Sequence, residues 1–230
     1  MFNDMEGISE LTGQPDRALH RPVDKIVLEA SVGHPHIKTA IVCPPTIYGP
    51  GRGPDNRRSQ QAYMGARCVL AQGEGFMPGS GKNIWHEVHV QDLSNLFLLL
   101  GEAAVSGGGK ATWNEQGYYL AENGSFAWGD IFKAVTKIAH SKGLLPSDEC
   151  RALEASDLWK ILPYGPLIWG SNSRGVSRRA KTLLGWKPEQ RGLMEELPDI
   201  VQGEAAALLQ ERALKAAAPW PRPMPAETDT

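Results

Sequence analysis

The longest continuous apolar run near the start of the chain covers residues 39–43, TAIVC, and is rich in β-branched side chains. This pattern predicts a fully buried strand of a parallel sheet. Four prolines and three glycines follow it within residues 44–54, so the strand is expected to end at Pro44 and to give way to a loop. Ligands bind just beyond the carboxyl ends of strands in open α/β sheets, which makes this loop the first candidate for a site. The alternative is an ordinary turn.

Apolar residues recur at helical spacing over most of the remaining chain. They predict six helices, at about 22–33, 58–72, 92–106, 125–143, 177–184 and 193–214. The last of these is expected to be broken near Pro198 or to start there. Strands are predicted at 85–90 and 118–121. Asp92 is expected to cap its helix, because a carboxylate can accept the free amide protons of a first turn. Weak or turn-like patterns cover residues 1–19, 73–81 and 146–173.

Strands and helices alternate, with more helix than strand, which is typical of an α/β fold. A parallel sheet of one or two strands cannot cover its own faces and edges. The sequence therefore predicts the latter part of a doubly wound parallel sheet whose opening part is missing. An exposed edge of such a half-sheet favours self-association, so we expect a homodimer.

Composition narrows the class of protein. The 230 residues carry a net charge of −2, and 41% of them are hydrophobic, which is ordinary for a globular protein. The near-neutral charge argues against a nucleic-acid or membrane surface, and neither a membrane span nor a signal peptide is expected. Cys43, Cys68 and Cys150 are widely spaced and odd in number, which predicts free thiols in a reducing, cytoplasmic setting.

Three segments, taken together, resemble the extended short-chain dehydrogenase/reductase family, whose members are often called NAD-dependent epimerase/dehydratase proteins. They are PPTIYGPG at 44–51, GSGKNIWHEVHVQDLS at 79–94 and AKTLLGWKPE at 180–189. Each is weak to moderate alone, but their order and spacing are fairly specific. The resemblance covers about residues 17–205, which is the second half of such an enzyme. It implies an incomplete Rossmann-like sheet followed by a small, mainly helical substrate domain.

The resemblance also implies NAD or NADP as cofactor and Lys25 as a catalytic residue. In the family a tyrosine stands four residues before this lysine and exchanges a proton with substrate. Here Arg21 takes that place, and arginine cannot serve as a proton donor. The glycine-rich turn that would hold the cofactor pyrophosphate does not occur in the sequence. The alternative for Lys25 is a solvated helix residue.

The remaining candidate site residues also come from the resemblance. Thr46 would face the substrate, and Trp85 would line the far side of the cleft. Trp85 aligns with the arginine that clamps the diphosphate in members acting on nucleotide-sugars. A tryptophan offers stacking and apolar area instead, so a small carbonyl or alcohol that is not a nucleotide-sugar is expected, although Trp85 could equally be a core residue. The backbone that would pass the nicotinamide ring consists of Pro44, Pro45, Ile47 and Tyr48.

His86 and His89 suggest a metal site at first sight. They lie three apart on a predicted strand, however, and therefore point to opposite faces. One metal ion could not take both, so no metal is expected.

The sequence thus predicts an irregular N-terminus at 1–19 and a remnant of the Rossmann-like domain at 20–110. A substrate domain is expected at 111–215 and a disordered tail at 216–230. The hypothesis is an NAD(P)-dependent oxidoreductase or epimerase, reduced to its substrate half and of doubtful activity alone. The second hypothesis is a non-catalytic binding or regulatory protein on the same scaffold.

Overall fold

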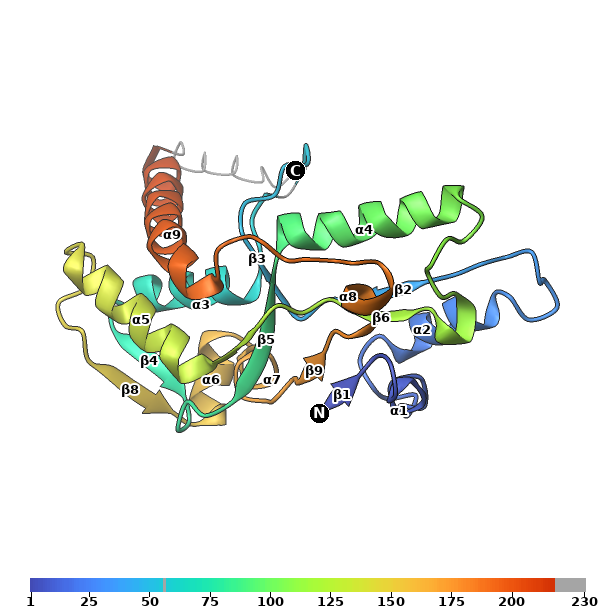
Figure 1. Cartoon of the computed structure of the whole chain (residues 1–230). Coiled ribbons are helices and arrows are strands. Elements are labelled where there is room, and N and C mark those ends of the chain that lie inside the picture. The colour runs from blue at the N-terminus through green and yellow to red at the C-terminus, as the bar shows by residue number, and fades with distance from the viewer. Residues whose placement is uncertain (56, 218–230) are drawn as a thin grey trace, which may run out of the picture.

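One extended segment, residues 41–48, runs through the middle of the molecule and joins its two lobes (Figure 1). The structure is a computed structural model, and it describes residues 1–55 and 57–217. Pro44 and Pro45 divide the segment into β2 (Ile41–Cys43) and β3 (Thr46–Tyr48), because proline cannot donate to a ladder. The loop expected from residue 44 onward is therefore wrong at 46–48, where the chain resumes as a strand of a second sheet.

The first lobe, named the sheet lobe, holds the remnant of the parallel sheet. β2 pairs in parallel with β6, and their side chains alternate between two layers. Val42 and Tyr119 pack toward α4, whereas Ile41 and Tyr118 pack toward α1. Its elements are β1 (Phe2–Asn3), α1 (Ile8–Thr12), α2 (Arg21–Glu29), β2, α4 (Val90–Val105), the 3₁₀ turn Asn114–Gln116, β6 (Tyr118–Leu120), β9 (Gly175–Val176) and α8 (Arg179–Leu183).

This lobe is open on one side. In the part of the chain that the structure describes, β2 pairs with β6 alone, and its residues are only half-buried. The prediction of a fully buried strand is wrong for this reason. The apolar face of α2 is also uncovered, with Ile26 70% exposed, and Phe97 and Leu98 on α4 are 56% and 60% exposed. The sheet is thus small and incomplete, as the sequence predicted.

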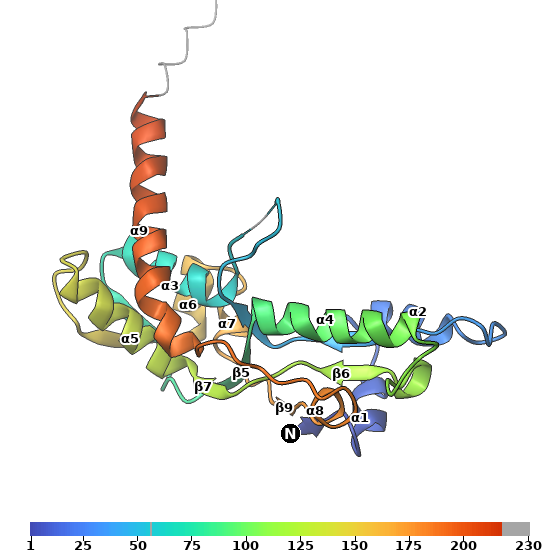
Figure 2. The same cartoon turned by 45° about the horizontal axis from the view of Figure 1, so that its top comes forward.

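The second lobe, named the helical lobe, is mainly helical and has its own core. Trp128 and Trp169 are fully buried there, among apolar side chains from every major element of the lobe. The last helix stands upright against the other two long helices of the lobe (Figures 1 and 2). The elements are α3 (Gln61–Gln72), β4 (Gly75–Pro78), α5 (Trp128–Ser141), β8 (Cys150–Leu153), α6 (Ala155–Ile161), α7 (Gly165–Ile168) and α9 (Leu193–Ala217).

A short mixed sheet connects the lobes. β3 pairs in parallel with β5 (Ile84–His89), and β5 pairs antiparallel with β7 (Ser125–Ala127). Tyr48 lies opposite His89, and Ile47 lies opposite Val88. Successive residues of these strands therefore face different cores, with Tyr48 in the helical lobe and Val88 in the sheet lobe.

Several predicted elements need correction. Residues 1–19 contain β1 and α1 instead of irregular chain, because β1 finds a partner in β9 far along the sequence. The turn-like stretch 73–81 contains β4, which pairs with β8. Ser125 begins β7 and not a helix, and α5 starts at Trp128. α9 runs without interruption through Pro198. The tail predicted to be disordered lies outside the described residues from 218 onward.

Asp92 is not the cap of α4. That helix begins at Val90, and its N-cap is His89, whose Nδ1 accepts a hydrogen bond from the Gln91 amide at 3.1 Å. The buried Asp92 carboxylate instead accepts the backbone amides of Glu189 and Gln190 at 3.0 and 3.1 Å. Trp186 donates to its carbonyl at 2.9 Å. Hydrogen bonds therefore join two of the three segments that carried the resemblance, 79–94 and 180–189.

Candidate functional site

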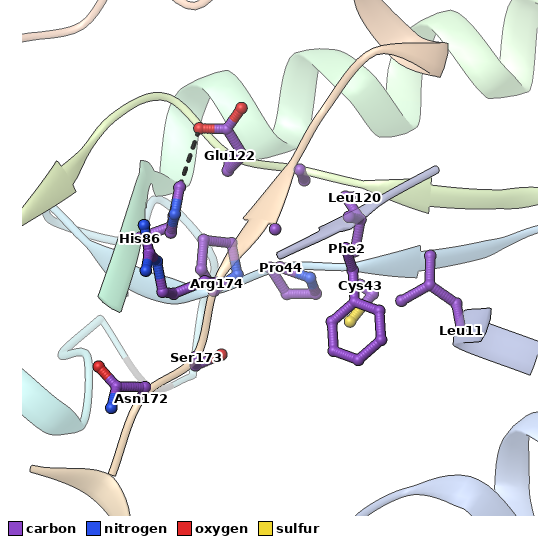
Figure 3. A pocket seen from close by; sticks show the side chains of 13 residues that line it. Phe2, Leu11, Cys43, Pro44, His86, Leu120, Glu122, Asn172, Ser173 and Arg174 are labelled. Atoms are coloured by element: carbon purple, nitrogen blue, oxygen red, sulfur yellow. Dashed lines mark hydrogen bonds and ion pairs between the residues drawn. The ribbon is translucent and has the colours of Figure 1, made fainter. Parts of the chain in front are cut away.

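A cavity of about 230 Å³ opens at the carboxyl ends of β2 and β6 (Figure 3). Parallel strands end at the same edge of a sheet, which is where ligands bind in open α/β folds. Its walls come from the sheet lobe, including the N-terminal segment, from β5 of the connecting sheet and from residues 172–174 ahead of β9. The lining residues are Phe2, Leu11, Cys43, Pro44, Pro45, His86, Leu120, Ala121, Glu122, Asn172, Ser173, Arg174 and Gly175.

The polar feature of the cavity wall is an imidazole–carboxylate pair. His86 Nδ1 lies 3.3 Å from Glu122 Oε2, and both residues are buried (Figure 3). His86 comes from β5, and Glu122 follows the end of β6. His89 points elsewhere, with Nε2 3.5 Å from Glu196 Oε1. The two histidines thus face different carboxylates. Among residues 1–55 and 57–217, no group of three His, Cys, Asp or Glu side chains is placed to hold a metal ion.

Glu122 is held in its charged form. Burial favours the neutral acid, but the amide protons of Ser177 and Gly124, together with Lys181 and His86, outweigh this effect. The pKa of the Glu122 carboxyl therefore lies below its ordinary value. The Ser177 amide donates to Oε1 at 2.9 Å and the Gly124 amide to Oε2 at 3.2 Å. A carboxylate fixed by backbone amides cannot swing away from its imidazole partner.

Replacing Glu122 with glutamine is expected to lower the free energy of unfolding by about 1–3 kcal/mol at neutral pH, because a buried charge-assisted hydrogen-bond set is lost. The folded-state pKa is lowered, so this contribution is complete above the ordinary pKa of a glutamate. It is lost as the pH falls through the folded value. The gap between the parent and the Glu122→Gln protein should therefore close in urea titrations taken down to about pH 3. Glu102→Gln on the exposed face of α4 is the control, and a gap that stays constant with pH would contradict the assignment.

The N-terminal segment forms one wall of the cavity and is tied down by Asp4. The buried Asp4 carboxylate accepts the amide protons of Leu120, Arg178 and Arg179 at 2.8, 2.8 and 2.9 Å. The Arg179 guanidinium, also buried, donates to the Asp4 carbonyl at 2.6 Å. These bonds hold Phe2 against the cavity.

The neighbouring wall is residues 172–175, which pair with β1 at Gly175 and which Trp85 holds in place. Trp85 Nε1 donates to the Ser171 carbonyl at 2.8 Å, and Trp85 forms a β-bridge with Ser173. Its ring packs edge-on against Trp128 at 6.4 Å between centroids. Trp85 is therefore half-buried behind the wall and does not itself line the cavity.

The structure brings together only some of the residues expected at the site. Pro44 and Pro45 line the cavity. Thr46 is fully buried beside them, and its hydroxyl has no hydrogen-bond partner among the described residues. Tyr48 faces the helical lobe, where its hydroxyl donates to the Arg191 carbonyl at 2.9 Å. Ile47 packs against the core of the sheet lobe. The roles given to these residues stay predictions.

Lys25 lies away from the cavity. It sits on α2 and forms an ion pair with Asp16, and the two side chains are 38% and 76% exposed. Arg21, in the tyrosine position, donates to the Gln14 carbonyl at 3.0 Å. Neither residue lines the cavity.

Sequence reasoning weighed His86 only as a metal ligand, and it missed Glu122 and the segment Asn172–Gly175. His86 and Glu122 are 36 residues apart, so no local spacing joins them. The segment 172–175 lies in a stretch without a clear hydrophobic period. The polar residue directly after the predicted strand 118–121 was the one available signal for Glu122, because it follows a strand end as the Pro44 loop does.

Comparison with known proteins agrees with this architecture. Residues 20–114 match the profile of the NAD dependent epimerase/dehydratase family. Oxidase ucsJ of an Acremonium species is 34% identical over 216 residues, which is 90% of this chain and 62% of that protein. The chain is therefore similar to the NAD-dependent epimerase/dehydratase family over residues 20–114 and to this oxidase over most of its own length.

Two solved structures show the same fold. UDP-glucose 4-epimerase of Thermotoga maritima, solved with UDP-glucose, has a TM-score of 0.55 at 18% identity and aligns with 82% of this chain and 52% of its own. dTDP-glucose 4,6-dehydratase of Bacillus anthracis, in complex with NAD, has a TM-score of 0.53 at 12% identity, covering 81% and 50%. The chain thus spans about half the length of these solved structures and 62% of the curated relative.

The residues present fit only part of a dinucleotide site. The strand ends and the cavity supply a wall for a ring, but no G-x-x-G-x-x-G turn joins a strand to a helix N-terminus in the described chain. The glycines between β3 and α3, at 49, 51 and 53, lack that spacing. The cofactor pyrophosphate therefore has no cradle in this part of the protein. None of the described helices is long and apolar enough to cross a membrane.

Proposed function

We propose that this chain is the substrate-binding half of an NAD(P)-dependent oxidoreductase that acts on an alcohol or carbonyl of a small molecule. The observation that carries the proposal is the cavity at the carboxyl ends of β2 and β6, with one buried imidazole–carboxylate pair in an otherwise largely apolar wall. Small-molecule sites are typically apolar cavities with a few placed polar groups. NAD or NADP is supported by the match of residues 20–114 to the NAD dependent epimerase/dehydratase profile and by the dehydratase solved with NAD.

Two observations favour a substrate without a nucleotide. The cavity measures about 230 Å³, which is below the usual range for drug-sized ligands. Arg174 is the one cation on its wall among the described residues, and Trp85 takes the place expected of a diphosphate-clamping arginine. We therefore do not expect this chain to bind the nucleotide-sugars after which the solved relatives are named.

The alternative, a non-catalytic binding or regulatory protein, is favoured by α2. Arg21 stands where a proton-exchanging tyrosine is expected, and Lys25 is paired with Asp16 outside the cavity. A protein with this arrangement can keep a ligand cavity while it lacks the chemistry of its relatives.

Thermal unfolding of the chain alone tests whether it lacks a dinucleotide site and a nucleotide-sugar site. A single cooperative transition is expected, without a shift from NAD(H), NADP(H) or UDP-glucose, because the pyrophosphate cradle and the diphosphate clamp are missing. A ligand at about a hundred times its Kd would add ~2.7 kcal/mol, which is easily seen. A clear shift with a dinucleotide would contradict the half-site proposal, and a shift with UDP-glucose would contradict the substrate class.

A chimera separates the enzyme from the binding protein. The dinucleotide-binding half of a family member is fused ahead of residue 1, with and without Arg21→Tyr, and NAD(P)H formation is followed with a panel of small alcohols and ketones. Turnover in either chimera supports the oxidoreductase. A chimera that binds NAD(H) and remains inactive with both residues at position 21 supports the binding protein.

A further inference from the structure

The cavity wall has one side chain suited to exchange a proton near neutral pH. Its ionisable residues in the described chain are Cys43, His86, Glu122 and Arg174. Burial raises the pKa of the Cys43 thiol, so it stays protonated. The Glu122 carboxyl, with its lowered pKa, stays charged. An arginine does not deprotonate in proteins, whereas imidazole is the side chain that ordinarily titrates between about pH 5 and 8.

The geometry also fixes which imidazole nitrogen faces the ligand. Nδ1 lies against the Glu122 carboxylate at 3.3 Å. Nε2 has no hydrogen-bond partner in residues 1–55 and 57–217, although the His86 side chain is only 11% exposed and lines the cavity. A carboxylate bound to Nδ1–H leaves Nε2 as the acceptor of the neutral ring and as a donor once the ring is protonated.

We propose that His86 Nε2 binds the oxygen of a hydroxyl or carbonyl group on a ring-sized ligand and holds the proton exchanged with that oxygen. Glu122 is the positioning residue that sets the tautomer of the ring. The inference rests on the proposed function of the same cavity and names the group that takes the place of the absent tyrosine. On proton uptake Nε2 gains the proton, and the imidazolium charge is balanced by the Glu122 carboxylate.

Other charges near the pair are few. Lys181 on α8 lies behind Glu122, with Nζ 3.2 Å from Oε1, and Arg174 lies on the cavity wall beside His86 (Figure 3). Both cations oppose protonation of the ring, whereas Glu122 favours it. The direct contact is with Glu122, so the carboxylate decides the orientation.

The size of the cavity selects the probes. An apolar protein cavity of about 150 Å³ holds a benzene ring, and this one measures about 230 Å³. Phenol, acetophenone and toluene share one ring and differ in the polar group: a hydroxyl that donates and accepts, a carbonyl that only accepts, and neither. Their affinities for the full chain can be measured by calorimetry or by ligand-detected NMR at about pH 8 and about pH 5.5, on either side of the imidazole range.

At about pH 8, phenol is expected to bind roughly fivefold more tightly than toluene, since its hydroxyl donates to neutral Nε2. Acetophenone should gain no such advantage there. Where the lower pH protonates the ring, Nε2 donates instead of accepting, and the preference for acetophenone over toluene should rise roughly fivefold.

Three variants and a control assign the effect. His86→Leu should abolish both preferences. His86→Gln keeps a hydrogen-bonding amide without a titrating proton, so the preferences should remain and their pH dependence should vanish. Glu122→Gln no longer fixes the proton of the neutral ring on Nδ1, so Nε2–H can donate to a carbonyl. Acetophenone should then bind more tightly than toluene even at about pH 8. His140→Gln, in the helical lobe next to the Leu145 carbonyl, should change nothing. Urea unfolding confirms that each variant is folded.

The proposal is overturned if the three probes bind the parent chain equally, if none binds, or if the preferences survive in His86→Leu. It is also overturned if the pH dependence persists in His86→Gln. These results are distinct from a failure of the proposed function, which a shift with UDP-glucose or with a dinucleotide on the chain alone would reveal.

Discussion

Replacing Trp128 with alanine is expected to lower the free energy of unfolding by about 3–5 kcal/mol, the usual cost of removing a buried aromatic ring. Trp128 is fully buried at the first turn of α5. Its ring meets Phe126 edge-on at 4.9 Å and Trp169 at 6.5 Å between centroids. Few neighbours could collapse into the resulting hole, because most of them are rings held by other elements.

Urea unfolding followed by circular dichroism measures this effect. Trp159→Ala is the matched control, since Trp159 is 60% exposed on α6 and its loss should cost less than about 0.5 kcal/mol. Equal losses in the two variants would mean that Trp128 does not belong to a packed core.

Replacing Asp4 with alanine is expected to cost about 3–5 kcal/mol, since it removes a buried charged acceptor and orphans its donors. Three backbone amides from distant parts of the chain point at this carboxylate. No neighbouring side chain of the described chain replaces it, and the Arg179 guanidinium is left buried beside the gap. Residues 2–11 should detach as a consequence and open the cavity wall that Phe2 and Leu11 form.

Two readouts test the Asp4→Ala prediction. Urea unfolding gives the loss of stability, and amide hydrogen exchange should show faster exchange at the amides of Leu120 and Arg179. Asp4→Asn keeps one carbonyl oxygen and should lose less. Glu6→Ala removes an ion pair with Arg178 whose side chains are 62% and 57% exposed, and it should cost at most about 1 kcal/mol. If Asp4→Ala lowered the free energy of unfolding no more than Glu6→Ala does, the hydrogen bonds of the Asp4 carboxylate would contribute no more than a surface ion pair.

The six helices with a clear apolar period could be predicted from the sequence because that signal is local, whereas the short helices α1, α6 and α7 could not. α3 and α9 repeat apolar residues at helical spacing, and α8 ends before Gly185, whose φ of 66° suits glycine. β2, β5 and β6 could be predicted, whereas the remaining strands could not, because their existence depends on distant partners. β1 has two residues and needs β9, and β4 needs β8, so neither has a period of its own to recognise.

The candidate site likewise contains residues that local signals could place and residues that they could not. Pro44 and Pro45 could be placed at the cavity because they end a strand, which is a local feature. His86 and Glu122 become a pair only when β5 and the end of β6 lie side by side. Asp92 was assigned to its own helix by a local rule, whereas its hydrogen-bond partners are Glu189 and Gln190. A local rule cannot weigh a partner that lies almost a hundred residues away.

The strand pair β3–β5 has a consequence for cooperativity. Tyr48 belongs to the core of the helical lobe, while its neighbour Ile47 packs against the core of the sheet lobe. The two cores therefore share one sheet as a common wall and contact its opposite faces. If one core unfolds, the other loses the sheet that covers it, so we expect the two lobes to unfold together in one cooperative transition. The most protected amides of the molecule belong at this wall, and not at the centre of either lobe.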